Sequence, residues 1–280
     1  MTSTITVKRL EKWSDIEKYR RHGWLYRGQR DASWKLETSL ERVCNRLGVP
    51  ENFRPKAEER LLRQFKRGYH QFTSHIPEKE SVLEWLSIMQ HHGAPTRLLD
   101  FTYSIYVAAY FAVETAESDC AIWALDATWA LKESQKCFRA AGKPQKMVKK
   151  LEQPFMEGDE QIVHKLCQTK PYARAALPST PFRLNERLRI QQGSFLVPGD
   201  IGGSFMSNLS SLQGVHDSKK VVKIIIPKSE RLNALAALWS MGLSRAVLFP
   251  GIDGYAQSLG VYHSLFAPTP YGKDSIPLIK

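Results

Sequence analysis

The densest run of reactive side chains in the chain is QHHGAPTRLLDFT, at residues 90–102. It brings together two histidines, an arginine, an aspartate and a threonine: His91, His92, Arg97, Asp100 and Thr102. An aspartate can accept a proton or stabilise positive charge, and an arginine can hold a phosphate or a carboxylate. The two histidines lack metal-ligand spacing, so we expect capping or core roles, with His92 also able to act as a base or ligand donor.

Arg97 and Asp100 each have two interpretations. On a strand, Arg97 and Leu99 would share one face while Leu98 and Asp100 share the other. A buried charge is costly without a partner, so at least one of the two should meet a ligand or a specific ion pair. An ion pair that only locks the turn is the structural alternative.

A second segment, Tyr26-Arg27-Gly28-Gln29, places an arginine near the end of an expected strand. The planar guanidinium suits a phosphate or a carboxylate, and a glycine beside it would let a ligand approach the backbone. The alternative is a surface arginine that precedes a turn.

Two further segments carry polar groups next to expected elements. Gln191 and Gln192 lead into a strand, and their amides can recognise ribose hydroxyls, bases or other amides. The alternative for them is an ordinary polar loop. Asp253 follows a glycine-bounded turn, where we expect it to cap a helix rather than to act in catalysis.

Several enzyme and metal classes have no motif here. The sequence contains no GxxxxGK[ST], GxGxxG or GxSxG pattern and no C-x-x-C pair. The four cysteines are widely spaced, which favours reduced thiols in a cytoplasmic protein and no metal site. No segment has the length and apolarity of a membrane span or the pattern of a signal peptide, so we expect no membrane contact.

The elements that must position these residues follow from hydrophobic periodicity and caps. We expect strands at residues 3–7, 24–29, 96–102, 121–125, 193–197, 221–226 and 245–249. We expect helices at 14–21, 56–72, 105–113, 145–151, 161–167 and 230–241, and one between Ser81 and the stop signal at 91–95. Strands on both sides of a helical middle predict an α+β fold, built as one domain over 1–280.

Charge is the unusual property of the composition. The 280 residues include 40 Lys plus Arg and 28 Asp plus Glu, which gives a net charge of +12. Residues 132–189 hold 13 basic and 6 acidic residues, so much of the surplus lies in an expected basic helical insertion at about 132–181. This predicts an anionic partner such as a nucleic acid or a nucleotide.

Three segments together resemble the FRG domain family, which is named after an aromatic-Arg-Gly motif. They are Tyr26–Gln29, residues 90–102 with the AAYFA run at 108–112, and residues 189–195; residues 248–254 also resemble the end of that family. FRG domains resemble distant ADP-ribosyltransferases. The resemblance therefore implies an ADP-ribosyltransferase-like split β-sheet core with surrounding helices.

The resemblance also implies roles for named residues. Arg27 would hold the NAD diphosphate, and the strand at 96–102 would cradle the nicotinamide ribose. The expected NAD-binding set is Tyr26, Arg27, Gln29, His92, Arg97 and Thr102. Gln192 would orient the ribose or the acceptor. Ser194 stands where these transferases carry a catalytic glutamate, so Asp100 or Asp253 becomes the expected carboxylate.

The expected activity is NAD-dependent ADP-ribosylation of a nucleic acid, with RNA as the first choice because of the basic surplus. FRG proteins are often effectors in bacterial conflict, so a toxin that is paired with an antitoxin protein is a coherent hypothesis. Two alternatives stay open. One is modification of a protein or hydrolysis of NAD, and the other is a non-catalytic module that binds RNA or a nucleotide.

Overall fold

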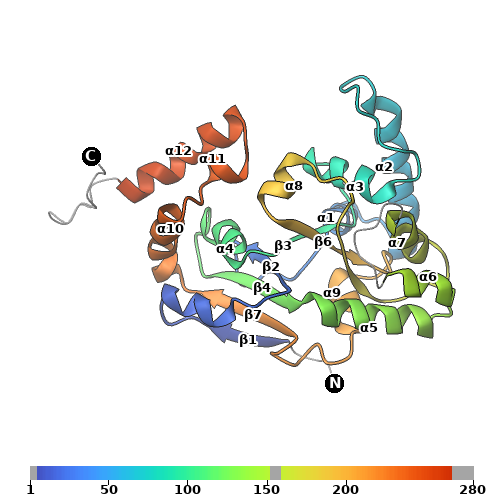
Figure 1. The fold of residues 1–280 in the computed structure, drawn as a ribbon, viewed down its shortest axis with the longest axis horizontal. Coiled ribbons are helices and arrows are strands. Elements are labelled where there is room, and N and C mark those ends of the chain that lie inside the picture. The colour runs from blue at the N-terminus through green and yellow to red at the C-terminus, as the bar shows by residue number, and fades with distance from the viewer. Residues whose placement is uncertain (1–4, 152–158, 267–280) are drawn as a thin grey trace.

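A seven-stranded sheet forms the centre of the molecule (Figure 1). The computed structural model describes residues 5–151 and 159–266. The strands are β1 (Thr6–Arg9), β2 (Trp24–Gln29), β3 (Leu99–Thr102), β4 (Cys120–Asp126), β5 (Ala176–Ser179), β6 (Gly193–Pro198) and β7 (Val221–Ile226). Their order is β1-β7-β4-β2-β3-β6-β5, and all neighbours are antiparallel except β1 and β7. This is the expected α+β class.

Helices cover both faces of this sheet and extend beyond it at two ends (Figure 1). The α-helices are α1 (Ser39–Arg46), α2 (Arg54–Tyr69), α3 (Val82–His91), α4 (Ile105–Val113), α5 (Ala127–Ala140), α6 (Gln145–Lys150), α7 (Asp159–Gln168), α8 (Glu186–Ile190), α9 (Phe205–Ser210), α10 (Arg231–Ser240), α11 (Arg245–Leu248) and α12 (Ile252–Phe266). Short 3₁₀ helices are η1 (Trp13–Tyr19), η2 (Glu51–Phe53) and η3 (Lys228–Glu230). Within the described residues, no helix is long and apolar enough to cross a membrane.

Two separate apolar clusters cover one face of the sheet. The first packs α4, α10 and η1 against β2, β4 and β7. The second packs α3, α6 and α7 against β5 and β6. Thr102 pairs with Tyr26 of the first cluster, and Asp100 pairs with Phe195 of the second. Because paired residues share a face, Asp100 and Thr102 lie between the two clusters.

The sheet is divided in the middle, between β2 and β3. Their only pairing is Tyr26 with Thr102, although β2 continues to Gln29 and β3 already starts at Leu99. By contrast, β2 pairs with β4 along its full length, and β3 does so with β6. The sheet is therefore two halves that meet at one residue pair, and Arg27 follows that pair directly.

Several predicted elements are confirmed. Strands 24–29 and 221–226 have the predicted bounds. Helix α4 also has the predicted bounds; Ser104 caps it, and it is buried nearly all round because its apolar residues face the sheet on one side and α10 on the other. Helix α10 ends before Gly242, which has a positive φ of 74° as a helix-terminating glycine does.

Two predicted strands are wrong, in part or fully. Residues 245–248 form helix α11, because Leu248 donates its amide to the carbonyl of Ser244 and places its side chain in the first cluster. The strand predicted at 96–102 begins only at Leu99. The backbone before it is bonded elsewhere, since the Thr96 carbonyl accepts from Leu40 and the Arg97 amide donates to Glu58.

Boundaries at the N-terminus also differ from the prediction. The first helix is the 3₁₀ helix η1, which begins at Trp13 rather than at a cap on Ser14. Its capping carboxylate is Asp15, which accepts from the amide of Lys12. Strand β1 starts at Thr6, and residues 3 and 4 of the predicted strand lie outside the described residues.

The basic segment at 132–181 contributes directly to the core. Most of α5, which packs on β5, comes from it, and so does β5 itself, an edge strand of the sheet. Phe138, Val148 and Leu166 of this segment are fully buried in the second cluster. Neither α5 nor β5 is expected from the sequence pattern, whereas α6 and α7 are; residues 152–158 lie outside the described residues.

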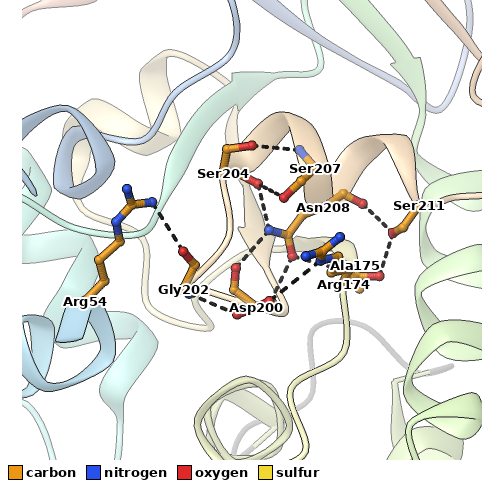
Figure 2. A network of polar contacts seen from close by, with 9 residues as sticks. All are labelled: Arg54, Arg174, Ala175, Asp200, Gly202, Ser204, Ser207, Asn208 and Ser211. Atoms are coloured by element: carbon orange, nitrogen blue, oxygen red, sulfur yellow. Dashed lines mark hydrogen bonds and ion pairs between the residues drawn. The ribbon is translucent and has the colours of Figure 1, made fainter. Parts of the chain in front are cut away.

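A polar network fixes the loop after β6 to β5 and α9 (Figure 2). The Asn208 amide is fully buried; its oxygen accepts from the backbone of Ala175 and Asp200, and its nitrogen donates to the carbonyls of Asp200 and Ser204. All four hydrogen-bonding positions of the side chain are thus used, as burial of an amide requires.

Candidate functional site

Arg27 reaches across the gap between β2 and β3. Its Nη1 donates to the Asp100 carbonyl over 2.7 Å and lies 3.7 Å from the Asp100 carboxylate. Its Nε is buried without a hydrogen-bond partner among the described residues. Burial lowers the pKa of Arg27, and the charge of Asp100 partly offsets this. The guanidinium therefore keeps unused donor capacity at the divided centre of the sheet.

The neighbours of Arg27 in the motif have structural contacts. The Tyr26 hydroxyl is buried, accepts from the Arg21 amide and donates to the Tyr19 carbonyl. A Cβ on Gly28 would lie 2.0 Å from the Ala108 carbonyl oxygen. Helix α4, and not a ligand, occupies the space that this glycine leaves.

Asp100 is the exposed carboxylate of the site. Its side chain is 59 % exposed, whereas that of Arg27 is 20 % exposed. Its charge also acts on Arg187 of α8, whose pKa is lowered by burial and partly restored by Asp100. One exposed acid thus lies near two partly buried arginines, so the local balance favours an anion.

Two arginines pack on the ring of Phe249, the residue directly after α11. The guanidinium carbons of Arg187 and Arg245 lie 4.3 and 4.5 Å from the centre of its ring. Arg245 also pairs at 2.9 Å with both carboxylate oxygens of Glu114, to which Tyr110 donates a hydrogen bond. These contacts hold α11 against α4 and α8 and keep Arg187 close to Asp100.

The turn between α8 and β6 lies next to the end of β3. Gln191 donates its side-chain amide to the Leu248 carbonyl, and its own carbonyl accepts from the Thr102 hydroxyl. Gln192 has a φ of +48°, a conformation that few residues other than glycine adopt, and its carbonyl accepts from the Tyr103 amide. Gln192 is exposed, and so is Tyr103, at 41 %.

Arg97 forms a structural ion pair, which is one of its two predicted interpretations. Its guanidinium and the Glu58 carboxylate are each only 2 % exposed and form an ion pair. Glu58 also accepts from the backbone amide of Arg97 and from Gln168. This pair joins α2 and α7 to the segment before β3, away from Arg27.

His92 lies in a separate cavity of about 280 Å³, which we call the histidine pocket. Its walls are the end of α2 with the following loop, α3, and the segment before α8; they include Tyr69, His75, Glu84, Ser87, His91, His92, Arg183 and Asn185. The rings of His91 and His92 meet edge to face at 4.8 Å. The pKa of His91 is lowered by partial burial and by the nearby charges of His92 and Arg187.

The remaining predicted residues do not join Arg27. Gln29 is buried, donates to the Lys35 carbonyl and accepts from the Trp123 indole. Asp253 is exposed in the first turn of α12 and forms no hydrogen bond or ion pair with any other described residue. It lies after the first position of that helix, so it is not the helix cap.

Ser194 is buried and turned toward β5. Its hydroxyl accepts from Thr180 and donates to the Ser179 carbonyl. A longer acidic side chain at this position would therefore meet the neighbouring strand.

Arg27 contacts Asp100, and the charge of Asp100 acts on Arg187. We group these three residues with Gln192 and Tyr103, which are hydrogen-bonded to each other next to β3, and call the set the Arg27 site. Sequence patterns indicate Arg27, Asp100 and Gln192 but not the other two. The signal available for Arg187 is its place in the basic RLRIQQ run before β6. No group of three or more metal-binding side chains occurs in the described part of the chain.

Comparison with known families gives one match. Residues 22–120 match the family model of the FRG domain. This range includes β2, α3, β3 and α4, whereas residues 189–195 and 248–254, which also carry the resemblance, lie outside it. No curated protein and no solved structure matches the chain.

Proposed function

This chain is an FRG-domain protein, and from that premise we propose that it transfers ADP-ribose from NAD to a nucleic acid, with RNA as the acceptor. The observation that carries the proposal is the Arg27 guanidinium at the divided centre of the sheet, with an unpartnered Nε. FRG domains resemble ADP-ribosyltransferases at the strand that bears this arginine.

The charges around Arg27 suit a dinucleotide. The guanidinium groups of Arg27 and Arg187 can each donate to a phosphate, and the NAD diphosphate offers two anionic groups. Tyr103 is exposed beside Gln192, so it can stack on a flat ring while the Gln192 amide bonds a ribose hydroxyl.

Asp100 is the carboxylate that we assign to the reaction. The bond between the ribose C1′ and the nicotinamide nitrogen breaks, and its electron pair leaves with neutral nicotinamide. A hydroxyl or amine of the acceptor forms the new bond to C1′ and releases one proton, which Asp100 can accept. The carboxylate also stabilises the positive charge that develops on the ribose.

A labelling experiment tests the proposal. The full chain is incubated with NAD radiolabelled in its adenylate phosphate, together with total RNA or with cell protein. We expect label in RNA. Arg27→Ala should weaken NAD binding by roughly 10–100-fold, because a charge-assisted hydrogen bond contributes about 1.5–3 kcal/mol.

Matched variants make the result specific. Arg30→Ala removes an exposed arginine that lies after the same strand, and it should keep full labelling. Asp100→Asn should bind NAD but transfer ADP-ribose more slowly. Equal labelling by Arg27→Ala and the unaltered chain would refute the assignment, and label in the protein fraction alone would change the acceptor class.

The burial of Ser194 favours a second function, a non-catalytic module that binds RNA or a nucleotide. In this case the Arg27 site would bind its anion without cleaving it, because no glutamate faces the ligand. This function predicts salt-dependent RNA binding and no release of nicotinamide. Measured consumption of NAD would exclude it.

A further inference from the structure

We propose that the histidine pocket binds a nucleobase with an exocyclic amino group, and that Glu84 accepts hydrogen bonds from that group. The inference rests on the proposed function, since transfer to RNA makes a base of the acceptor the natural occupant. It adds a second subsite to the Arg27 site and gives it a chemical preference.

Glu84 is the acidic residue that lines the histidine pocket. Its side chain is only 8 % exposed, yet the only group paired with it among the described residues is His75, at 3.6 Å. The imidazole of His75 is 62 % exposed and carries a charge only when protonated. The carboxylate lines the pocket from the first turn of α3, so it can accept N–H donors from a ligand there.

The rest of the pocket fits a flat, polar ring. Tyr69 and the imidazoles of His91 and His92, which meet edge to face, provide aromatic surfaces. Asn185 donates to the Ser87 hydroxyl over 3.3 Å, and both residues line the cavity, so they offer further hydrogen-bonding groups. Stacking together with a few fixed polar contacts is how proteins bind unpaired bases.

Charge favours a nucleotide over a basic peptide side chain. Arg183 lines the pocket, and the charge of Arg187 reaches His91 at its edge. These cations would attract a phosphate and repel a lysine or arginine. Arg187 also acts on Asp100, so its charge reaches both the edge of the pocket and the carboxylate that we assign to the reaction.

Calorimetric titration of the full chain with single nucleotides tests this inference. The probes are AMP, GMP, CMP and UMP, of which only UMP lacks an exocyclic amino group. We expect at least one of the first three to bind at least tenfold more tightly than UMP. The pair CMP and UMP is the sharpest comparison, because the two differ at the group that would meet Glu84.

Variants connect this preference to the carboxylate. Glu84→Gln should weaken binding of the amino-bearing nucleotides by about tenfold and remove the preference, because its amide presents donors where the carboxylate only accepts. Glu59→Gln is the matched control on an exposed glutamate of α2 and should bind as the unaltered chain does. A melting temperature for each variant separates loss of binding from loss of fold.

Several outcomes would overturn the inference. These are equal affinity for UMP and the other three nucleotides, unchanged binding by a folded Glu84→Gln variant, or tighter binding of a lysine-containing peptide. The titration contains no NAD, so its outcome is separate from that of the labelling experiment. A base preference without labelled RNA would support the pocket while the proposed transfer fails.

Discussion

Removal of the charge on Glu58 tests whether Arg97 acts in the fold. The Glu58 carboxylate accepts from the Arg97 amide at 3.1 Å, from the Arg97 Nε at 2.7 Å and from Gln168 at 3.3 Å, besides its short contact with Nη2. Glu58→Gln would leave the Arg97 guanidinium charged, buried and without its counter-ion. A broken buried pair costs about 3–5 kcal/mol.

For a chain of this size, that loss lowers the melting temperature by about 6–20 °C. Urea unfolding and thermal melting measure it directly. Glu59→Gln, which removes an exposed partner of Arg63 on the same helix, should cost less than about 0.5 kcal/mol. The double variant Glu58→Leu with Arg97→Met should recover most of the lost stability, because no unpaired charge then remains buried.

NAD binding provides the second measurement. If Arg97 is structural, the double variant should bind NAD as tightly as the unaltered chain. A double variant that keeps its melting temperature but loses NAD binding would refute the structural assignment. That result would instead support the predicted role of Arg97 in binding NAD.

Three further predictions concern single positions. Gly28→Ala should destabilise the fold by about 1–3 kcal/mol or more, because its Cβ would meet the backbone of α4 at 2.0 Å, whereas Gly68→Ala, with open space around it, should be neutral or stabilising in urea unfolding. Burial lowers the pKa of His164 to about 4, so the unfolded chain takes up the proton first and stability should fall by about 2.5 kcal/mol as the pH drops from 6.5 to 4. His164→Gln should flatten that pH profile; an unchanged slope would contradict the assignment. Ser194→Glu should lower the melting temperature without adding transfer activity, because the new carboxylate would be buried against β5.

The sequence predicts the inner strands and helix α4 because their patterns are local. Helix α4 has its own cap at Ser104, strand β2 is a continuous apolar run before Arg27, and both have the predicted bounds. Helix α11 is missed because four residues are too few to distinguish the periodicity of a helix from the alternation of a strand. The partner of Arg97 is missed because Glu58 lies 39 residues away on another helix, a distance that no local pattern spans.

The candidate site shows the same limit. Arg27 and Asp100 carry visible chemistry, yet only the fold shows that β2 and β3 stop pairing between them. Arg187 appears in the sequence as one cation among many in a basic segment, and its approach to Asp100 depends on the packing of α8 and α11. The histidine pocket combines residues from three separate segments, so it needs the tertiary structure.

The hydrogen bond from Arg27 to the Asp100 carbonyl connects the break between β2 and β3 with the kind of ligand that we expect at the Arg27 site. In an unbroken sheet that carbonyl would accept from a strand amide, and here a side chain takes the place of the missing donor. A molecule that draws Arg27 away breaks this charge-assisted hydrogen bond, which contributes about 1.5–3 kcal/mol. A diphosphate can offset that cost better than a weakly charged molecule, so we expect the break in the sheet to favour strongly anionic ligands.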